Sequence, residues 1–485
     1  MKRKSKVILF VICFIISVMI LCFFVTGYYS VDTERIYSQG YIDYATKDAY
    51  IRDGRLVSAL IFVMVGIFNP TIKTMYIINI IISIVILSIC VIQIYAIIKK
   101  YKILETTRNK VIAFLLSYTY IFNFLIVDIL KFIDSFVICT SILIFIIAIK
   151  KIIIEQKKKL GLVLTILGVI CYQGTIPVYI ATAILVTLLE HKKIDKEFFK
   201  KILPCAISIC IASIISLIIV NLVPIITGMQ KTDRMNNIDF LRNIKKNIIG
   251  MNEAVFYSFY MFPPYAWIGT AMLILFVSIG YGINKKDINF AVNILFIFMF
   301  YMLSSFVMLP IQTFTNAPRV MLVMGQVISA MLIYSYCTNF RNTKINSYEK
   351  IMIIVMVLYF VITLGSILKS TYEYKLGNII DKAFSDKIEN EIETLEKQGI
   401  TINKIGLKYT GNGQNVQKYS KLVCEQSVYI KGLYTSTLNE FYTGRKLTRV
   451  QDFTKEKEEK YFENPSEEEV QFKNLGDVLY ILIDL

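Results

Sequence analysis

Long apolar runs alternate with short polar segments along most of this chain. About 18 or more almost uninterrupted apolar positions occupy each of five runs, residues 7–27, 76–98, 202–222, 289–309 and 351–368. A helix of about 20 such residues crosses the hydrocarbon core of a bilayer and satisfies its own backbone hydrogen bonds. The pattern therefore predicts an all-α polytopic membrane protein.

Basic clusters between the runs indicate the topology, because Lys and Arg collect in cytoplasmic loops. The clusters are Lys99-Lys100-Tyr101-Lys102, Lys150-Lys151, Lys157-Lys158-Lys159, Lys192-Lys193 and Lys285-Lys286. If each is cytoplasmic, the chain has about eleven transmembrane helices, at residues 7–27, 76–98, 111–130, 134–151, 157–172, 176–190, 202–224, 264–283, 289–309, 318–337 and 351–368. The N-terminus is then cytoplasmic and the region after the last span is extracytoplasmic.

Two segments need separate interpretation. The run 7–27 follows a Lys-rich start, as a signal peptide would, but it lacks a small-x-small cleavage site before Tyr28 and is interpreted as an uncleaved span. Residues 56–68 are apolar but too short to cross comfortably, and a crossing there would deliver Lys99 and Lys100 to the outside. A helix lying at the outer interface, or re-entering there, fits better.

The chain then divides at its last span. Residues 1–369 form the transmembrane domain, with a first outside loop at 28–55, the interfacial helix 56–68 and a second outside loop at 228–262. Residues 370–485 form a small extracytoplasmic α/β domain. In it, helical periodicity from Asp381 to Gln398 ends at Gly399, and strand-like stretches cover Ile400 to Tyr409 and Val478 to Ile483, with a turn signal at Gly411-Asn412-Gly413. The charged run Lys455 to Glu469 is a solvated loop or helix.

Composition and charge exclude other classes of protein. Of the 485 residues, 55% are hydrophobic and 18% charged, and the formal net charge is +17. Residues 370–485 hold 16 Lys and Arg against 19 Asp and Glu, so the positive excess lies in the membrane part. That distribution is a topology signal and predicts no nucleic-acid partner. The nine Cys lie mostly in apolar runs, and with a single His they predict neither a disulfide framework nor a zinc site.

The first outside loop concentrates ionisable side chains. Asp32, Glu34 and Arg35 lie within about eight residues of the end of the first span, and Arg55 ends the loop. Mixed charges among tyrosines are ordinary for a wetted interfacial loop. A carboxylate beside the lipid headgroups is equally suited to act on a lipid-linked substrate, and Arg35 and Arg55 could grip a phosphate with their planar forks.

The loop also resembles a known family. The pattern Asp32-x-x-Arg35, then Gly40-Tyr41, then Gly54-Arg55 is similar to the first outside loop of the glucosyltransferase II family. These are bacterial polytopic membrane glycosyltransferases of the GT-C superfamily. Further similarities are Tyr172-Gln173 at the end of a span and Pro318-Arg319 at the start of another. Members of the family often have adjacent acids where this chain has Asp32-Thr33-Glu34.

The resemblance implies a reaction in the bacterial plasma membrane. A sugar, glucose or another hexose, passes from a polyprenyl-phosphate donor to a hydroxyl of a cell-envelope glycan on the outer face, with inversion. Asp32 would be the general base, with Glu34 as a second carboxylate. Arg35, Arg55 or Arg319 would neutralise the leaving phosphate. No cofactor is implied with certainty, and no residue is assigned as a metal ligand. Asp32 and Glu34 could bind Mg²⁺ or Mn²⁺, or neither.

Each of the further candidate substrate-binding residues has both a functional and a structural interpretation. Lys131, between Asp128 and Asp134, belongs either to a functional charged group or to a surface turn. Tyr172 and Gln173 either bind sugar hydroxyls or satisfy a neighbouring helix. Arg319 either binds substrate or only snorkels. The second outside loop is basic and has an apolar face, so it either attracts a lipid phosphate or binds anionic headgroups; its residues are Lys231, Arg234, Ile238, Leu241, Arg242, Ile244, Lys245 and Lys246.

Two other functions compete with the glycosyltransferase. An envelope polysaccharide polymerase or ligase would also be polytopic and use outside arginines, but such proteins tend to carry the key loop late in the chain. A lipid-linked glycan transporter or flippase would show internal repeats or interrupted helices in matching halves. The sequence contains no matching segments of that kind.

Overall fold

The computed structural model describes residues 3–229, 240–308, 318–340, 346–409, 420–427, 429, 436–450, 453, 460–462 and 470–483. The chain forms two compact units. The first, called the helical unit here, is Met1–Thr26 with Tyr41–Leu368, and the second, the composite unit, is Gly27–Gly40 with Lys369–Leu485. Residues 28–55, which the sequence predicts as a single loop, are divided between the two units.

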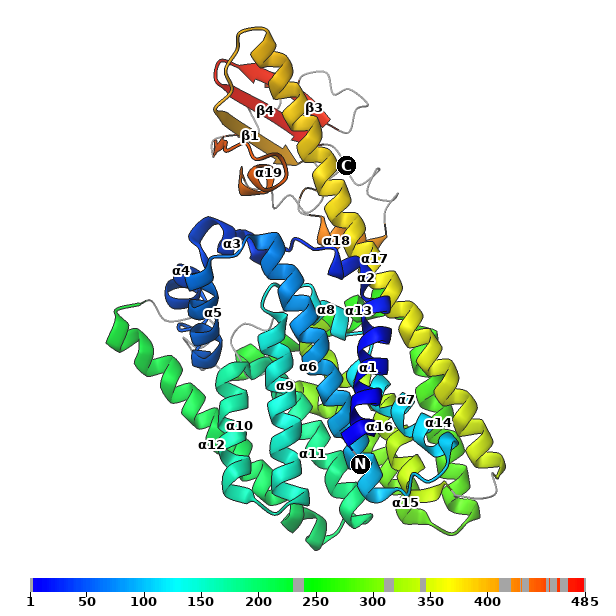
Figure 1. The fold of residues 1–485 in the computed structure, drawn as a ribbon. Helices are drawn as coiled ribbons and strands as arrows, with labels where there is room; N and C mark the ends of the chain where they lie inside the picture. The colour runs from blue at the N-terminus through cyan, green and yellow to red at the C-terminus, as the bar shows by residue number, and fades with distance from the viewer. Residues whose placement is uncertain are drawn as a thin grey trace. The chain divides into compact units, whose positions relative to one another are not determined.

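The helical unit consists of helices joined by short connections, with α6, α9 and α11 lying side by side (Figure 1). Its elements are α1 (Arg3–Ile20), α2 (Cys22–Val25), α4 (Tyr41–Asp43), η1 (Tyr44–Asp48), α5 (Leu56–Phe68), α6 (Ile72–Tyr101), α7 (Thr107–Ile121), α8 (Ile126–Leu130), α9 (Ser135–Ile149), η2 (Lys150–Ile154), α10 (Lys158–Cys171), η3 (Gln173–Thr175), α11 (Ile176–His191), α12 (Lys196–Thr227), α13 (Phe240–Met261), α14 (Pro264–Asn284), α15 (Ile288–Ser304), η4 (Ser305–Met308), η5 (Pro318–Met321), α16 (Leu322–Asn339) and the first part of α17 (Ser347–Lys397).

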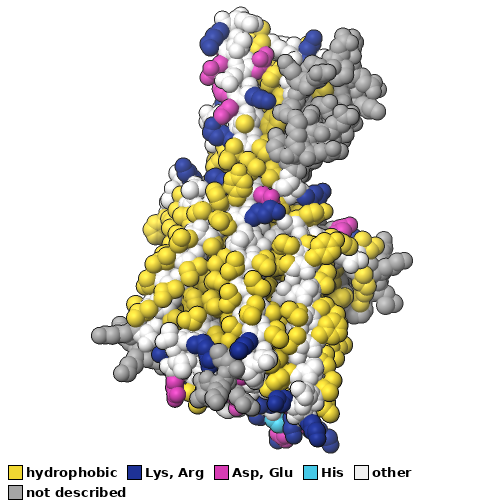
Figure 2. Space-filling view, turned by 90° about the vertical axis from the view of Figure 1, so that its right-hand side faces the viewer, with side chains coloured by type: hydrophobic (Ala, Val, Ile, Leu, Met, Phe, Trp, Pro, Cys, Tyr) yellow, Lys and Arg dark blue, Asp and Glu magenta, His cyan; other side chains and the backbone are white. Residues whose placement is uncertain are grey.

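The expected multi-pass helical membrane architecture is confirmed at the level of its helices. Among the described residues, eight helical segments are long and apolar enough to cross a membrane: Ile72–Tyr101, Ser135–Ile154, Gln173–His191, Lys196–Thr227, Pro264–Asn284, Ile288–Val307, Pro318–Asn339 and Ser347–Lys397. Hydrophobic side chains cover much of the helical unit on the face shown in Figure 2, as they do on a lipid-facing surface.

Three of the eleven expected spans are shorter than these eight. Residues 7–27 lie in α1 and α2, which break at Leu21, and residues 111–130 lie in α7 and α8, with a break at 122–125. Residues 157–172 form α10, with 14 residues. A helix of 14 or 15 residues is roughly 22 Å long, which is less than the hydrocarbon thickness of about 30 Å. The count of eleven spans stays a prediction.

The two ends of the helical unit differ in charge. At one end, called the basic end, α6 and α11 finish together, where Lys100 forms an ion pair of 3.1 Å with Glu190. Lys102, just past α6, donates to the carbonyl of Phe340 just past α16. Because successive helices alternate in direction, the basic clusters at residues 99–102, 150–159, 192–193 and 285–286 all fall at this end. In Figure 2 Lys and Arg side chains gather at the lower edge of the unit.

The opposite end, called the loop end, is closed by short elements. Tyr76 near the start of α6 donates to the carbonyl of Leu130 at 2.9 Å. Buried Asn79 donates to the carbonyl of Phe132 at 2.9 Å and accepts from the amide of Phe136 at 2.9 Å. These contacts fix the turn between α8 and α9, so its charged side chains have defined positions.

The structure describes the predicted interfacial helix at 56–68 and part of the predicted second outside loop at 228–262. α5 covers Leu56–Phe68, the same residues as the expected interfacial helix, and ends at Asn69 in the left-handed conformation. In the second outside loop, residues 230–239, with Lys231, Arg234 and Ile238, lie outside the described residues. The rest of that loop forms α13, which buries Asn247, Met251 and Ala254.

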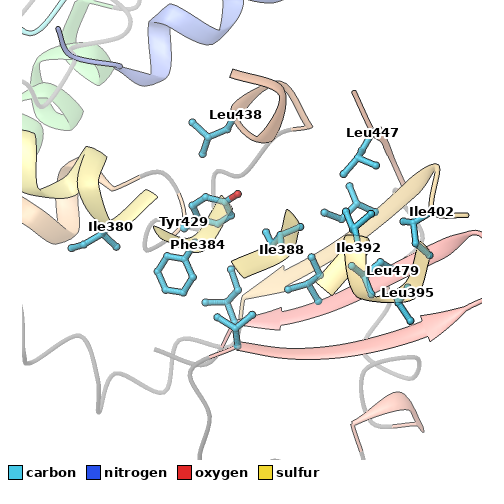
Figure 3. Close-up of a cluster of buried hydrophobic side chains, with 14 of the residues drawn as sticks. Ile380, Phe384, Ile388, Ile392, Leu395, Ile402, Tyr429, Leu438, Leu447 and Leu479 are labelled. Carbon is cyan, nitrogen blue, oxygen red and sulfur yellow. The ribbon is translucent and has the colours of Figure 1, made fainter. Parts of the chain in front are cut away.

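The composite unit packs one face of α17 on a four-stranded sheet of order β2-β1-β4-β3. β1 (Lys404–Tyr409) is parallel to β2 (Thr448–Arg449) and to β4 (Val478–Ile483), and β3 (Val470–Leu475) is antiparallel to β4. Figure 3 shows Ile380, Phe384, Ile388, Ile392 and Leu395 directed from α17 toward this core. They recur every three or four residues, which is the spacing of one helix face.

Three further helices belong to the composite unit: α3 (Val31–Gln39), α18 (Lys421–Gln426) and α19 (Ser436–Thr443). The sequence predicts separate helices at 351–368 and from Asp381 to Gln398, but the structure joins them in α17, which has 51 residues. The expected turn at Gly411-Asn412-Gly413 and most of the run from Lys455 to Glu469 lie outside the described residues.

Candidate functional site

Arg55 is the centre of a polar cluster at the loop end of the helical unit. Its Nη2 lies 3.2 Å from a carboxylate oxygen of Asp53, and its Nε donates to the side-chain carbonyl of Gln173 at 3.2 Å. The guanidinium carbon lies 4.8 Å from the centre of the Tyr172 ring, a cation–π distance. Nη1 makes no hydrogen bond to the described residues and is available as a donor to an added group.

The charge of Arg55 is stabilised by its surroundings. Burial by itself lowers the pKa of the guanidinium, but Asp53, and after it Tyr172 and Asp134, raise that pKa above its ordinary value. Asp134 also accepts a hydrogen bond of 2.7 Å from the hydroxyl of Tyr50, a side chain that is 1% exposed. Arg55 is therefore a permanent cation in a largely dry environment.

Gln173 joins three parts of the chain at this cluster. Its Nε2 donates to the backbone carbonyl of Asp53 at 3.0 Å and to the hydroxyl of Ser216 in α12 at 3.2 Å. Its carbonyl oxygen accepts from Arg55, so both ends of the amide are used within the protein. Of the two explanations that the sequence left open for Gln173, these contacts support binding to neighbouring elements.

A second charged cluster surrounds Asp128 of α8, which is 0% exposed. Its carboxylate lies 2.6 Å from Nζ of Lys131, accepts from the backbone amide of Arg319 at 2.9 Å and lies 3.7 Å from the Arg319 guanidinium. Burial raises the pKa of Asp128, but Lys131 and Arg319 lower it more, so the net shift is downward. The Arg319 guanidinium carbon lies 4.4 Å from the centre of the Phe132 ring. Arg319 is thus held by specific partners.

The two clusters adjoin one another. η3, which begins at Gln173, contacts η5, which contains Arg319. Asp134 lies in the same turn as Lys131 and bonds to Tyr50 from the first cluster. The result is one group of three cations and three carboxylates at the loop end. The Tyr172 ring lies against Arg55, and the Phe132 ring lies against Lys131 and Arg319.

The structure therefore brings together five of the residues that the sequence singled out: Arg55, Lys131, Tyr172, Gln173 and Arg319. Asp32, Glu34 and Arg35 lie instead in α3 of the composite unit. Arg35 is exposed, and the side chains of Asp32 and Glu34 lie outside the described residues.

Asp53 and Tyr50 were not predicted as site residues, and Asp134 was named only beside Lys131 as part of a charged group or a surface turn. Asp53 is separated from Arg55 only by Gly54, which is the local signal that could have identified it. Tyr50 and Asp134 are 84 residues apart in the chain, and no sequence pattern indicates that they meet. Within the described part of the chain, no group of three or more His, Cys, Asp and Glu side chains is placed to hold a metal ion.

No protein-family model matches the chain, and no curated protein shows significant similarity to it. The resemblance to the glucosyltransferase II family rests on the motifs of the first loop, Tyr172-Gln173 and Pro318-Arg319.

Proposed function

We propose that the protein is a membrane glycosyltransferase acting on a lipid-phosphate sugar. It moves glucose or another hexose from a polyprenyl-phosphate donor to a hydroxyl of a cell-envelope glycan. The observation that supports this most directly is the charged group at the loop end, where Arg55, Lys131 and Arg319 adjoin within a multi-pass helical unit. A donor anchored in the bilayer presents its phosphate at such an end.

Guanidinium groups suit the donor phosphate for two reasons. A guanidinium can donate to a phosphate oxygen, as Nη1 of Arg55 is available to do, and it keeps its charge at every physiological pH. Burial beside Tyr172 and Phe132 lowers the local dielectric, which strengthens the attraction of the arginines for an anion. When the bond from sugar to phosphate breaks, negative charge grows on the phosphate, so cations at that place favour the transition state.

The resemblance assigns the general base to Asp32, with Glu34 as a second carboxylate and Arg35 as a further phosphate ligand. The base takes the proton of the acceptor hydroxyl while the acceptor oxygen bonds to the anomeric carbon. The bond from that carbon to the phosphate oxygen breaks on the opposite side, and the polyprenyl phosphate leaves with both electrons. The configuration is therefore inverted. This reaction balances without a metal, and the resemblance leaves open whether Asp32 and Glu34 would hold Mg²⁺ or Mn²⁺, or neither.

The proposed topology places eleven spans in the plasma membrane of a bacterium, with α1, α7 and α10 added to the eight longer segments. The basic end faces the cytoplasm, because Lys and Arg are retained on that side. The N-terminus is then cytoplasmic, and the loop end and the composite unit are extracytoplasmic.

The test uses the purified full-length protein in detergent or nanodiscs with polyprenyl-phosphate hexose and envelope glycan. We expect sugar transfer by the wild type, and a loss on the order of 100-fold in kcat/KM for Arg55→Gln and for Arg319→Gln. Lys73→Gln is the matched control, because Lys73 is an exposed cation near the start of α6, and it should keep full activity.

Asp32→Asn tests the base separately. It should abolish transfer while donor binding remains, whereas Asp43→Asn, a control in the same stretch whose carboxylate pairs with Lys47 at 2.8 Å, should have no effect. Equal transfer by wild type and Asp32→Asn would remove Asp32 from the mechanism. Movement of the lipid-linked sugar across the membrane without transfer would favour a flippase.

A further inference from the structure

The segment that carries the candidate base is built into the composite unit. Gly27–Gly40 is separated from Lys369 by more than 300 residues of chain, yet both belong to that unit. α3 contacts α19, and the Tyr37 ring of α3 lies 6.3 Å from that of Phe441 in α19. Tyr29, two residues before the start of α3, is 2% exposed, and its ring lies 4.5 Å from that of Phe441.

One side chain fixes the backbone at the entry to α3. The amide of Tyr29 donates to Oδ1 of Asn378 at 2.7 Å, and Nδ2 of Asn378 donates to the carbonyl of Tyr29 at 2.9 Å. The side-chain amide of Asn378 thus satisfies both the N–H and the C=O of Tyr29, as the backbone of a neighbouring β-strand would. Asn378 is 6% exposed, so neither bond is easily replaced by water.

The neighbouring contacts extend this attachment on both sides. Lys375, one turn earlier on α17, donates to the carbonyl of Gly27. On the other side, Ser30 and Thr33 form a capping box, in which the Ser30 amide donates to the Thr33 hydroxyl at 3.2 Å. Because Ser30 follows Tyr29 directly, the position of Tyr29 on Asn378 determines where the first turn of α3 begins.

We infer that Asn378 is a positioning residue for the proposed sugar transfer: it holds the entry to α3 and thereby places Asp32, which lies three residues after Tyr29. The inference rests on the proposed function for its catalytic consequence. It assigns a role to the C-terminal part of the chain, which supplies the support for a helix encoded near the N-terminus. Asn378 touches no substrate and acts through the backbone of Tyr29.

The experiment compares Asn378→Ala with Asn390→Ala in the full-length protein. Both substitutions remove an asparagine from α17, but Asn390 is exposed and serves as the matched control. Hydrogen exchange is followed on peptides from residues 27–40, and sugar transfer is measured with polyprenyl-phosphate hexose and envelope glycan. Asn378→Asp is a second variant, which keeps the acceptor for the Tyr29 amide and loses the donor to its carbonyl.

In Asn378→Ala, the amides at the start of α3 should exchange about tenfold faster. The kcat should fall on the order of 100-fold, as expected for a misplaced base, while the KM for the donor stays unchanged because the cations for its phosphate lie in the helical unit. Asn378→Asp should fall between wild type and Asn378→Ala in both measurements, and Asn390→Ala should match the wild type.

The outcomes separate this inference from the proposed function. Unchanged exchange in residues 27–40 of Asn378→Ala overturns the positioning role whatever the activity. Faster exchange with wild-type kcat overturns the link from α3 to catalysis. If the wild type transfers no sugar but Asn378→Ala still loosens α3, the proposed function fails and the attachment of α3 by Asn378 stands.

Discussion

The backbone amide of Arg319 donates a hydrogen bond of 2.9 Å to the carboxylate of Asp128, although 191 residues separate them in the chain. The same carboxylate lies 2.6 Å from Nζ of Lys131. One buried acid therefore ties the start of α16 to the turn between α8 and α9. A buried carboxylate is costly unless it is paired, so this arrangement fixes both cations at the loop end.

Asp128→Ala should lower the free energy of unfolding by about 3–5 kcal/mol, because it removes the buried carboxylate that lies 2.6 Å from Lys131 and accepts from the amide of Arg319. Thermal unfolding in detergent can be followed with a thiol-reactive dye, since Cys13, Cys90 and Cys139 are buried in the folded protein. In the control Asp43→Ala, an exposed pair with Lys47 is lost, and the change should stay below about 1 kcal/mol. Similar losses in the two variants would contradict the buried-pair interpretation.

The stability of the wild type should also decrease at acid pH through Asp128. Its pKa in the folded protein is lowered from the ordinary value of 3.8, after the opposing effect of burial, by Lys131 and Arg319. A lowered pKa contributes stability that is fully present above 3.8 and is lost as the pH falls through the lower folded value. Melting temperatures measured from pH 5 downward should fall more steeply for wild type than for Asp128→Asn. If the melting temperatures of wild type and Asp128→Asn fell in parallel with pH, the protonation of Asp128 would not contribute to the loss of stability.

The helices could largely be predicted from the sequence, because long apolar runs indicate membrane-spanning helices and basic clusters indicate which end of each helix is cytoplasmic. α5 and β4 coincide with the predicted 56–68 and 478–483. The break at Leu21 and the one after Ile121 could not be predicted, because the surrounding residues remain apolar. In the second case the Asn123 side chain accepts from the amide of Leu125 at 3.0 Å, which replaces a helical bond by a local one.

The site could be predicted only in part. Arg55, Tyr172 and Arg319 were identifiable because each borders an apolar segment at the expected outer side. The contact of Tyr50 with Asp134, and the division of the first loop at Gly40, depend on contacts between residues distant in the chain. Such contacts follow from tertiary packing, which hydropathy and local motifs do not encode.

The proposed topology predicts opposite accessibility for two introduced cysteines. In a variant without the native cysteines, Ser38→Cys in exposed α3 should react with a membrane-impermeant maleimide on intact cells. Lys158→Cys at the exposed start of α10 should react only after the membrane is permeabilised, because the basic end faces the cytoplasm. Labelling of Lys158→Cys on intact cells, or protection of Ser38→Cys, would reverse the assigned orientation.

Gly54→Ala should both destabilise the helical unit and weaken donor binding. Gly54 has a φ of 72°, and a Cβ there would lie 2.5 Å from Cγ2 of Val220 in α12. The left-handed conformation alone costs an alanine about 1–2 kcal/mol, and the steric overlap adds to that cost. Any shift is passed to Arg55, the next residue, whose side chain bonds to Gln173. We therefore expect a lower melting temperature and a raised KM for polyprenyl-phosphate hexose.

The matched control for Gly54→Ala is Gly269→Ala. Gly269 lies inside α14, and a Cβ there meets nothing within 4 Å. The substitution should leave the KM unchanged and stabilise the protein by about 0.5–1 kcal/mol, as expected for replacing glycine within a helix. If Gly54→Ala behaved like Gly269→Ala, the close approach of Gly54 to α12 would not hold the Arg55 cluster, and its geometry would have to depend on the contacts of Arg55 with Asp53, Gln173 and Tyr172.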